Sequence, residues 1–354
     1  MSCGLGGAWT GKTQAGEPSR RQVMVGGKRM LTVDIHCHSY VHDVWPLIEE
    51  SEEIGYLRPL IDSPLRPKID LPNVEYRLEQ MDEQGIDIQA ISLHVGQYHH
   101  WAGYDLAREI VAIQNEKIAE VCAAHPDRFV GLGAVALQHP DLAVEQMRHG
   151  IKNLDMRGFM ITGSVNGLEL ADPMFHPFWQ AAEELGCVIF IHPRNFPAAQ
   201  ERLGGNGRLD NVIGNPLETT VALSHLIYEG TLDRFPGVRI CAAHGGGYLA
   251  SYIGRSDHCI EHFSQACKAV GQLPSQYLRN QLYFDSLIYT TEGLRHLVAT
   301  VGADRIVIGT DFPFGMGNKD SVNHILSTPG LSNDDKQAIL GRTAAELLGI
   351  DRTA

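Results

Sequence analysis

Three features are missing from this sequence, and each absence excludes a class of protein. The seven cysteines are odd in number and widely spaced, and none forms a C-x-x-C pair, so a zinc site made of cysteines is not expected. Several cysteines, such as Cys187, lie inside apolar runs, which favours reduced, buried thiols and a cytoplasmic location. No run of about 18 apolar residues occurs, so no transmembrane helix is expected. No long run of lysine and arginine occurs, and the formal net charge is −13, so we expect neither a nucleic-acid partner nor a membrane partner.

The chain is predicted to consist of a short extension and one large domain. Residues 1–29 are rich in small, polar and basic residues and lack the apolar core of a secretory signal, so we interpret them as a flexible N-terminal extension, with a locally docked extension as the alternative. Residues 30–354 are predicted to form one catalytic domain, because a barrel of alternating strands and helices often has this length. The composition, with 44% hydrophobic and 20% charged residues, is that of a folded globular protein. We also expect a homodimer or a higher homo-oligomer.

Short apolar runs rich in strand-forming residues recur along the domain, with helix-period segments between them. This alternation predicts parallel strands with helical crossovers, and eight such units predict a closed (β/α)8 TIM barrel. The alternative is an open doubly wound sheet, which usually has a glycine-rich turn after its first strand. Here the first strand continues into His36-Cys37-His38 instead. The predicted strands are Leu31–Ile35, Ile88–Leu93, Phe129–Val135, Gly158–Thr162, Val188–Ile191, Val238–Ala243, Leu282–Phe284 and Arg305–Gly309.

Histidines and an aspartate stand where several of these strands end. His36 and His38 follow the first strand, His192 the fifth and Asp311 the eighth. Two side chains that are two residues apart on a strand point to the same side, so His36 and His38 can bind one ion together. A lone H-x-H is more often surface or core histidine, but four such residues at one end of a barrel indicate a metal site. Three imidazoles and a carboxylate suit Zn²⁺, with Mn²⁺, Fe²⁺ or Co²⁺ as alternatives.

We expect a single divalent ion, because the end of the fourth strand (Met160-Ile161-Thr162-Gly163) has no lysine that could bridge two metals. His244 follows the sixth strand and precedes three glycines, which leave open space near its imidazole. We interpret His244 as the general acid and base, with a fourth metal ligand as the alternative. Arg255 lies eleven residues further on, in a predicted helix, where it could hold a substrate carboxylate or form a surface salt bridge.

The sequence resembles the amidohydrolase-2 family and, within it, the aminocarboxymuconate semialdehyde decarboxylases. The matching stretches include DIHCH (34–38), RLEQMDEQGID (77–87), FIHP (190–193), FPGVRICAAHGGG (235–247) and GADRIVIGTDFPFGMG (302–317), and the resemblance covers nearly everything after Met30. It implies that His36, His38, His192 and Asp311 hold one zinc ion and that His244 acts on water at the metal. It also implies that Arg255 holds a substrate carboxylate and that a second arginine, loosely matched by Arg66, does the same.

Two departures from the family pattern indicate a different substrate. Arg194 follows the His-Pro of the fifth strand, where these decarboxylases tend to have tryptophan, and Met316-Gly317-Asn318 replaces their usual Pro-Leu-Gly-Glu. An additional arginine would suit another acidic substrate, such as an aromatic or pyridine-type carboxylate.

The reaction predicted from these residues is the non-oxidative decarboxylation of a small unsaturated or aromatic carboxylic acid. The alternative is metal-dependent hydrolysis of a C–N, ester or lactone bond, and a non-catalytic binding protein is a third possibility. The sequence gives weaker evidence of a functional role for the other histidines. His94, His99 and His100 could line the pocket or pack on the barrel mouth, and His225, His258 and His262 are interpreted as structural or surface residues.

Overall fold

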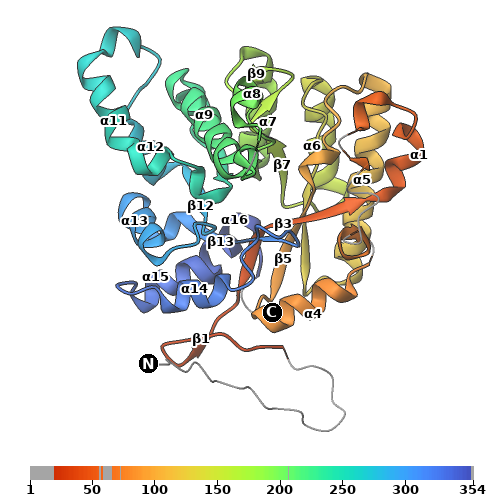
Figure 1. Cartoon of the computed structure of the whole chain (residues 1–354), viewed down its shortest axis with the longest axis horizontal. Coiled ribbons are helices and arrows are strands. Elements are labelled where there is room, and N and C mark those ends of the chain that lie inside the picture. Colours follow the sequence, from red (N-terminus) through yellow and green to blue (C-terminus); the bar gives the residue numbers. More distant parts are fainter. Residues whose placement is uncertain (1–19, 56, 59–65, 72, 206, 352–354) are drawn as a thin grey trace.

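The computed structural model describes residues 20–351, except 56, 59–65, 72 and 206. Eight parallel strands form a ring in which each strand pairs with the next one along the barrel, and the last strand, β13, pairs with the first, β3. This closure confirms the predicted TIM barrel (Figure 1). The strands are β3 (Val33–Val41), β5 (Ile88–Leu93), β6 (Phe129–Gly133), β7 (Gly158–Thr162), β10 (Val188–His192), β11 (Arg239–Ala242), β12 (Leu282–Asp285) and β13 (Ile306–Phe312).

Helices surround the strands and connect their ends (Figure 1). The longer ones are α4 (Glu75–Gln84), α5 (Tyr104–Ala124), α6 (Pro140–Asn153), α7 (His176–Leu185), α9 (Asn215–Tyr228), α11 (Leu249–His262), α12 (Pro274–Asn280), α13 (Thr291–Val301) and α14 (Ser321–Ser327). Short elements add α1 (Trp45–Ile48), α3 (Arg66–Ile69), α8 (Gln200–Leu203), α10 (Thr231–Arg234), the edge strand β4 (Asp70–Leu71) and the hairpin of β8 (Ser164–Val165) and β9 (Leu168–Glu169). None of the helices in the described part of the chain is long and apolar enough to cross a lipid bilayer.

The closing helix that was predicted for Ser332–Gly349 is present, but it has three parts. It begins at α15 (Asn333–Gln337), where the Ser332 side chain accepts a hydrogen bond from the backbone of Asp335 and the Asp335 side chain bonds back to Ser332. A π-helical segment (Ala338–Arg342) then leads into α16 (Thr343–Leu348). A Cβ atom at Gly341 would lie 2.0 Å from the backbone oxygen of Leu31, so this segment packs directly against the start of the barrel.

The hydrophobic core consists mainly of the barrel strands. Parallel strands in a barrel are covered on both faces, so their apolar residues run almost without interruption. Ile189, Phe190, Ile240 and Ile308 are completely buried. This rigid ring fixes the positions of the side chains at its carboxyl-terminal end.

Part of the predicted N-terminal extension is a hairpin packed on the barrel. Residues 1–19 lie outside the described residues, whereas β1 (Met24–Val25) and β2 (Lys28–Arg29) pair antiparallel. Val23 and Val25 are buried, and Arg29 Nη2 lies 2.5 Å from Asp87 Oδ1, just before β5 begins. The hairpin therefore contacts the amino-terminal end of the barrel strands.

Candidate active site

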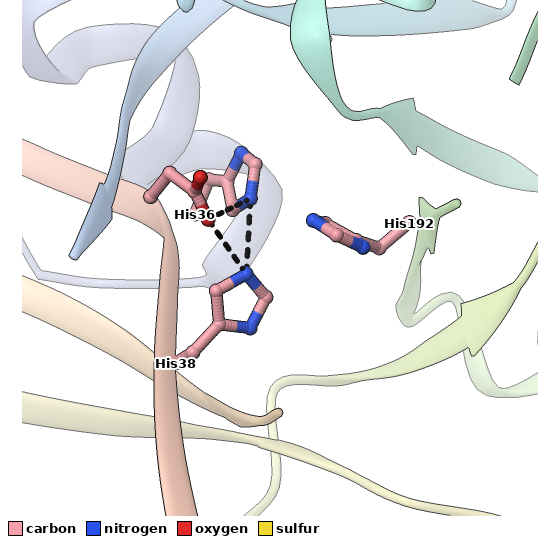
Figure 2. Close-up of side chains that lie close together, drawn as sticks. His36, His38 and His192 are labelled. Atoms are coloured by element: carbon pink, nitrogen blue, oxygen red, sulfur yellow. Dashed lines mark hydrogen bonds and ion pairs between the residues drawn. The ribbon is translucent and has the colours of Figure 1, made fainter. Parts of the chain in front are cut away.

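Three imidazoles and one carboxylate meet at the carboxyl-terminal end of the barrel. His36 and His38 come from β3, His192 from the end of β10, and Asp311 from β13. One ligand atom from each lies within 4.8 Å of all the others, and all four residues are buried. Figure 2 shows the imidazoles of His36 and His38, from one strand, pointing toward that of His192 on another. The Asp311 Oδ1 atom is 3.4 Å from His36 Nε2 and 3.1 Å from His38 Nε2.

The hydrogen bonds of the three histidines determine which nitrogen faces the centre. Each Nδ1 lies beside an oxygen that can only accept a hydrogen bond, so Nδ1 carries a hydrogen, and in the neutral ring Nε2 carries the lone pair. Three Nε2 atoms thus converge next to the Asp311 carboxylate, and the buried His192 Nε2 has no hydrogen-bond partner among the described residues. This donor set fits a divalent cation. The Nδ1 partners are Asp285 Oδ2 for His36 (2.6 Å), Leu93 O for His38 (3.0 Å) and Pro193 O for His192 (2.9 Å).

The electrostatics of the cluster also favour a bound cation. Burial opposes protonation of His36, but Asp285 and Asp311 outweigh it and raise its pKa to about 10. Burial likewise opposes ionisation of Asp311, yet its contacts with His36 and His38 hold its pKa well below the usual range. Burial and the neighbouring histidines keep the pKa of His192 well below its ordinary value, so this ring is neutral. The cluster therefore combines the neutral imidazole of His192 and the ionised carboxylate of Asp311 with a proton on His36, which a divalent cation would displace.

Asp285, which no sequence motif marks, contacts both His36 and the turn that carries His244. Besides His36, its carboxylate accepts hydrogen bonds from the backbone N–H groups of His244 (2.9 Å) and Gly245 (2.9 Å). Burial would raise its pKa, but the His36 contact outweighs burial and lowers it. A Cβ atom at Gly309 would lie 2.8 Å from the Asp285 Cβ, so the glycine leaves room for this carboxylate. Its position in the sequence could have indicated this contact, because Asp285 is the last residue of β12 and lies at the same end of the barrel as the proposed ligands.

His244 lies beside the ligand cluster, on the turn after β11. Its ring centroid is 5.1 Å from those of both His36 and His192. It is not part of the four-residue group whose ligand atoms lie within 4.8 Å of one another. Burial, followed by the charge of His36, lowers the pKa of His244 to about 4. The imidazole is therefore neutral near pH 7, and its role as general acid and base stays a prediction.

A cavity of about 420 Å³ opens onto this side of the cluster. This volume is in the range of small-molecule sites. His244 and Asp311 lie in its wall with several apolar and aromatic side chains, so a planar, largely apolar substrate could contact both. The other lining residues are Asn211, Val212, Asn215, Pro216, Gly247, Tyr248, Ser251, Leu287, Ile288, Tyr289 and Met316.

None of the three predicted substrate arginines belongs to the four-residue ligand cluster. Arg194, two residues after His192, donates from Nη1 to the backbone oxygen of Tyr98 (3.2 Å). Arg255 is exposed on α11, one helical turn beyond the cavity-lining Ser251. Arg66 forms an ion pair with Asp70, with 3.1 Å between Nε and Oδ2. Their roles toward a substrate stay predictions.

The loop after β5 contains three further histidines close to Arg194. Burial is the main cause that lowers the pKa of all three, to about 3 for His94 and His100 and to about 4 for His99. The positive charge of Arg194 lowers each of these pKa values further. His94 lies near the ligand cluster, with its ring centroid 6.4 Å from that of His38 and 5.1 Å from that of Phe314. These histidines are neutral near pH 7, and Arg194 adds positive charge beside them.

The fold and the four converging ligands define a class of protein, the amidohydrolases. A family model described as amidohydrolase matches residues 33–350, and the chain belongs to this family.

Among curated proteins, the chain is 30% identical to 2-amino-3-carboxymuconate-6-semialdehyde decarboxylase of Dictyostelium discoideum, over 91% of this chain and 93% of that protein. It is also 30% identical to gamma-resorcylate decarboxylase of Rhizobium sp. (strain MTP-10005), over 77% and 85% of the two chains. Among solved structures, 5-carboxyvanillate decarboxylase of Novosphingobium aromaticivorans, complexed with manganese and 4-hydroxy-3-methoxy-5-nitrobenzoic acid, superposes with a TM-score of 0.82 at 21% identity, over 95% and 100% of the chains. These relatives support the predicted enzyme class, a carboxy-lyase of the amidohydrolase superfamily.

Proposed function

We propose that this protein is a metal-dependent, non-oxidative decarboxylase of a small aromatic or unsaturated carboxylic acid. The observation that carries the proposal is the convergence of three Nε2 atoms and the Asp311 carboxylate beside a neutral His244, where His244 and Asp311 line one cavity. The relatives by sequence are decarboxylases of such acids, which supports the same reaction class here.

The proposed metal ligands are His36, His38, His192 and Asp311. The nitrogen-rich set suits Zn²⁺, and Mn²⁺, Fe²⁺ or Co²⁺ also fit, because carboxylate and imidazole ligands do not select strictly among these ions. A bound divalent ion would supply positive charge that holds the acidic oxygens of the substrate and stabilises negative charge in the transition state. Asp285 holds His36 in the tautomer that presents Nε2, so it is a positioning residue of this set.

His244 is the proposed proton carrier. In the reaction Ar–COO⁻ + H⁺ → Ar–H + CO₂, a C–H bond forms at the carbon that bears the carboxylate, and the C–C bond to that carboxylate breaks. The electron pair of the broken bond restores conjugation in the product. Neutral His244 accepts a proton from water or from an acidic group of the substrate and delivers it to the ring carbon. The apolar lining provided by Leu287, Ile288 and Met316 excludes water around that carbon.

Arg255 and Arg194 are the proposed substrate-binding cations. Arg66 is a weaker candidate because its guanidinium already forms an ion pair with Asp70. Arg255 would reach the cavity from the face of α11 that carries Ser251, and Arg194 would approach from the His94 side. A carboxylate held between the ion and a guanidinium would have its reactive carbon beside His244.

The test is a substrate screen with product analysis. We would incubate the metal-loaded enzyme with hydroxybenzoates, hydroxypicolinates and muconate semialdehydes and measure released carbon dioxide. A decarboxylase releases one carbon dioxide for each acid consumed. If an uncharged ester, lactone or amide were turned over faster than any acid, without carbon dioxide, the hydrolase alternative would replace the proposal.

A further inference from the structure

A second group of metal-ligating side chains lies on α11, far from the barrel strands. His258, Glu261 and His262 occupy the last turns of this helix, which stands at the edge of the molecule next to α12 (Figure 1). Their spacing, H-x-x-E-H, places all three on one helix face. One ligand atom of each lies within 4.8 Å of the others, and all three residues are exposed. They are outside the four-residue cluster of the candidate active site, and the sequence predicts structural or surface roles for the two histidines.

The two imidazoles are already arranged as a pair. Their ring centroids are 3.8 Å apart and their planes are inclined by 40°. His262 Nδ1 lies 2.9 Å from the backbone oxygen of His258, which can only accept, so Nδ1 carries the hydrogen and Nε2 keeps its lone pair for a ligand. A hydrogen bond of this kind, from the nitrogen that does not bind the metal, orients the ring of a metal-binding histidine.

Glu261 completes the group by adding a negative charge. Its Oε2 atom is 3.9 Å from His258 Nδ1, and the two side chains are 58% and 67% exposed. Side chains this exposed can shift by the ångström or so needed to bring their ligand atoms to about 2 Å from one ion. Two imidazoles and one carboxylate favour a transition metal over Ca²⁺ or Mg²⁺, which prefer oxygen ligands only.

We propose that His258, Glu261 and His262 form a second, surface site for a divalent transition metal such as Zn²⁺ or Ni²⁺. The site is separate from the proposed catalytic function and does not rest on it. With three ligands from one helix and water in the remaining positions, it binds its ion more weakly and exchanges it faster than the buried cluster. A bound ion would link successive turns of α11 and restrain the carboxyl-terminal end of the helix.

The experiment is a titration of Ni²⁺ into untagged protein whose buried site is already loaded, followed by calorimetry and by competition with a chromogenic chelator. We expect one additional binding event per chain. His258→Ala and His262→Ala should each weaken it about tenfold or more. Each substitution removes a direct ligand, and loss of a residue that only hydrogen-bonds to a ligand already costs about 10- to 100-fold. The control is His149→Ala, which removes an exposed histidine from α6 and should leave the event unchanged.

Two measurements keep the test decisive. Circular dichroism and decarboxylase activity should be the same in all variants, which shows that any loss of binding comes from the missing imidazole and not from unfolding. Cys259 and Cys267 interact with each other next to this site and are the rival soft ligands. The proposal is wrong if no additional event occurs up to millimolar Ni²⁺, or if the event survives in a His258→Ala/His262→Ala protein and disappears in Cys259→Ser.

Discussion

His244 and Asp311 both have backbone conformations that side chains other than glycine seldom adopt. Each has a φ angle of +55°, in the left-handed region. Such a residue costs about 1–3 kcal/mol and persists only where the surroundings impose it. For His244 the constraint is visible, because Asp285 accepts the N–H groups of His244 and of Gly245 after it. The conformation turns the imidazole of His244 toward the ligand cluster.

Replacing His244 tests its role directly. We expect His244→Ala to lower kcat by about 10²- to 10⁴-fold, because the proton carrier is lost. Its metal content should stay near that of the wild type, since the ring lies outside the four-ligand group. Steady-state kinetics and elemental analysis measure the two effects. Loss of the ion in this variant would instead show that His244 is a ligand.

Asp285→Asn should weaken metal binding while leaving all four proposed ligands in place. An amide that donates to His36 Nδ1 would favour the tautomer with its hydrogen on Nε2, and an amide that accepts would be a weaker partner than the carboxylate. We expect about a 10- to 100-fold loss of metal affinity, measured by chelator competition. The exposed Asp155→Asn provides the matched control. Unchanged affinity would show that Asp285 does not position His36.

The arginine predictions concern the charge of the substrate. Arg255→Lys should lower kcat/KM by one to two orders of magnitude, since a lost bidentate contact costs about 1.5–3 kcal/mol and lysine cannot reproduce the planar fork. Arg194→Ala should change the preference among acids more than the best rate. Kinetics that do not respond to either substitution would remove both residues from the substrate site.

The N-terminal hairpin offers a prediction at the level of a secondary-structure element. Val25 is 3% exposed and neighbouring Met24 is 49% exposed. Val25→Ala should destabilise the protein by about 1–2 kcal/mol through lost apolar burial, and so lower Tm by a few degrees. Met24→Ala should have almost no effect. Because the hairpin contacts the amino-terminal end of the strands, kcat/KM should not change in either variant. Equal melting temperatures of the two variants would show that the hairpin is not packed on the barrel.

Apolar periodicity was sufficient to predict the bounds of several strands and helices. Ile88–Leu93, Gly158–Thr162 and Tyr104–Ala124 were predicted with the bounds that the structure has, because apolar periodicity marks buried strands and helices clearly. β3 and β13 extend several residues beyond the predicted ends. Their extensions carry His36, His38 and Asp311, polar residues that a hydrophobic pattern assigns to a loop although the barrel buries them.

Some residues of the candidate site could be predicted from the sequence and others could not. The four ligands follow from their position at strand ends, which the barrel topology brings together. Asp285 was missed because its role depends on contacts with a ring from β3 and a turn after β11, which are distant in sequence. The positions of Arg66, Arg194 and Arg255 depend on side-chain conformations and loop packing, for which the sequence has no comparable pattern.

At the scale of the whole molecule, we expect one tightly bound divalent ion per chain. The four converging ligands provide one complete site, and an ion at the exposed α11 group should be lost on desalting through a weak chelator. Elemental analysis of the desalted protein checks this. Two retained ions, or none after supplementation with metal, would contradict it. The predicted homodimer or higher homo-oligomer can be measured on the same samples by sedimentation.

The pairing of β13 with β3 places the two ends of the folded domain against each other. Thr310 donates a hydrogen bond to Asp34, 276 residues earlier in the chain, and three of the four proposed ligands lie on these two paired strands, His36 and His38 on β3 and Asp311 on β13. An ion held there would act as a removable cross-link between the beginning, middle and end of the polypeptide. Closing loops of that length is costly in chain entropy, and an ion that binds only the folded state shifts the equilibrium in its favour. The metal would then stabilise the closed barrel as well as take part in the reaction. Its removal would first weaken the pairing between the first strand, β3, and the last, β13.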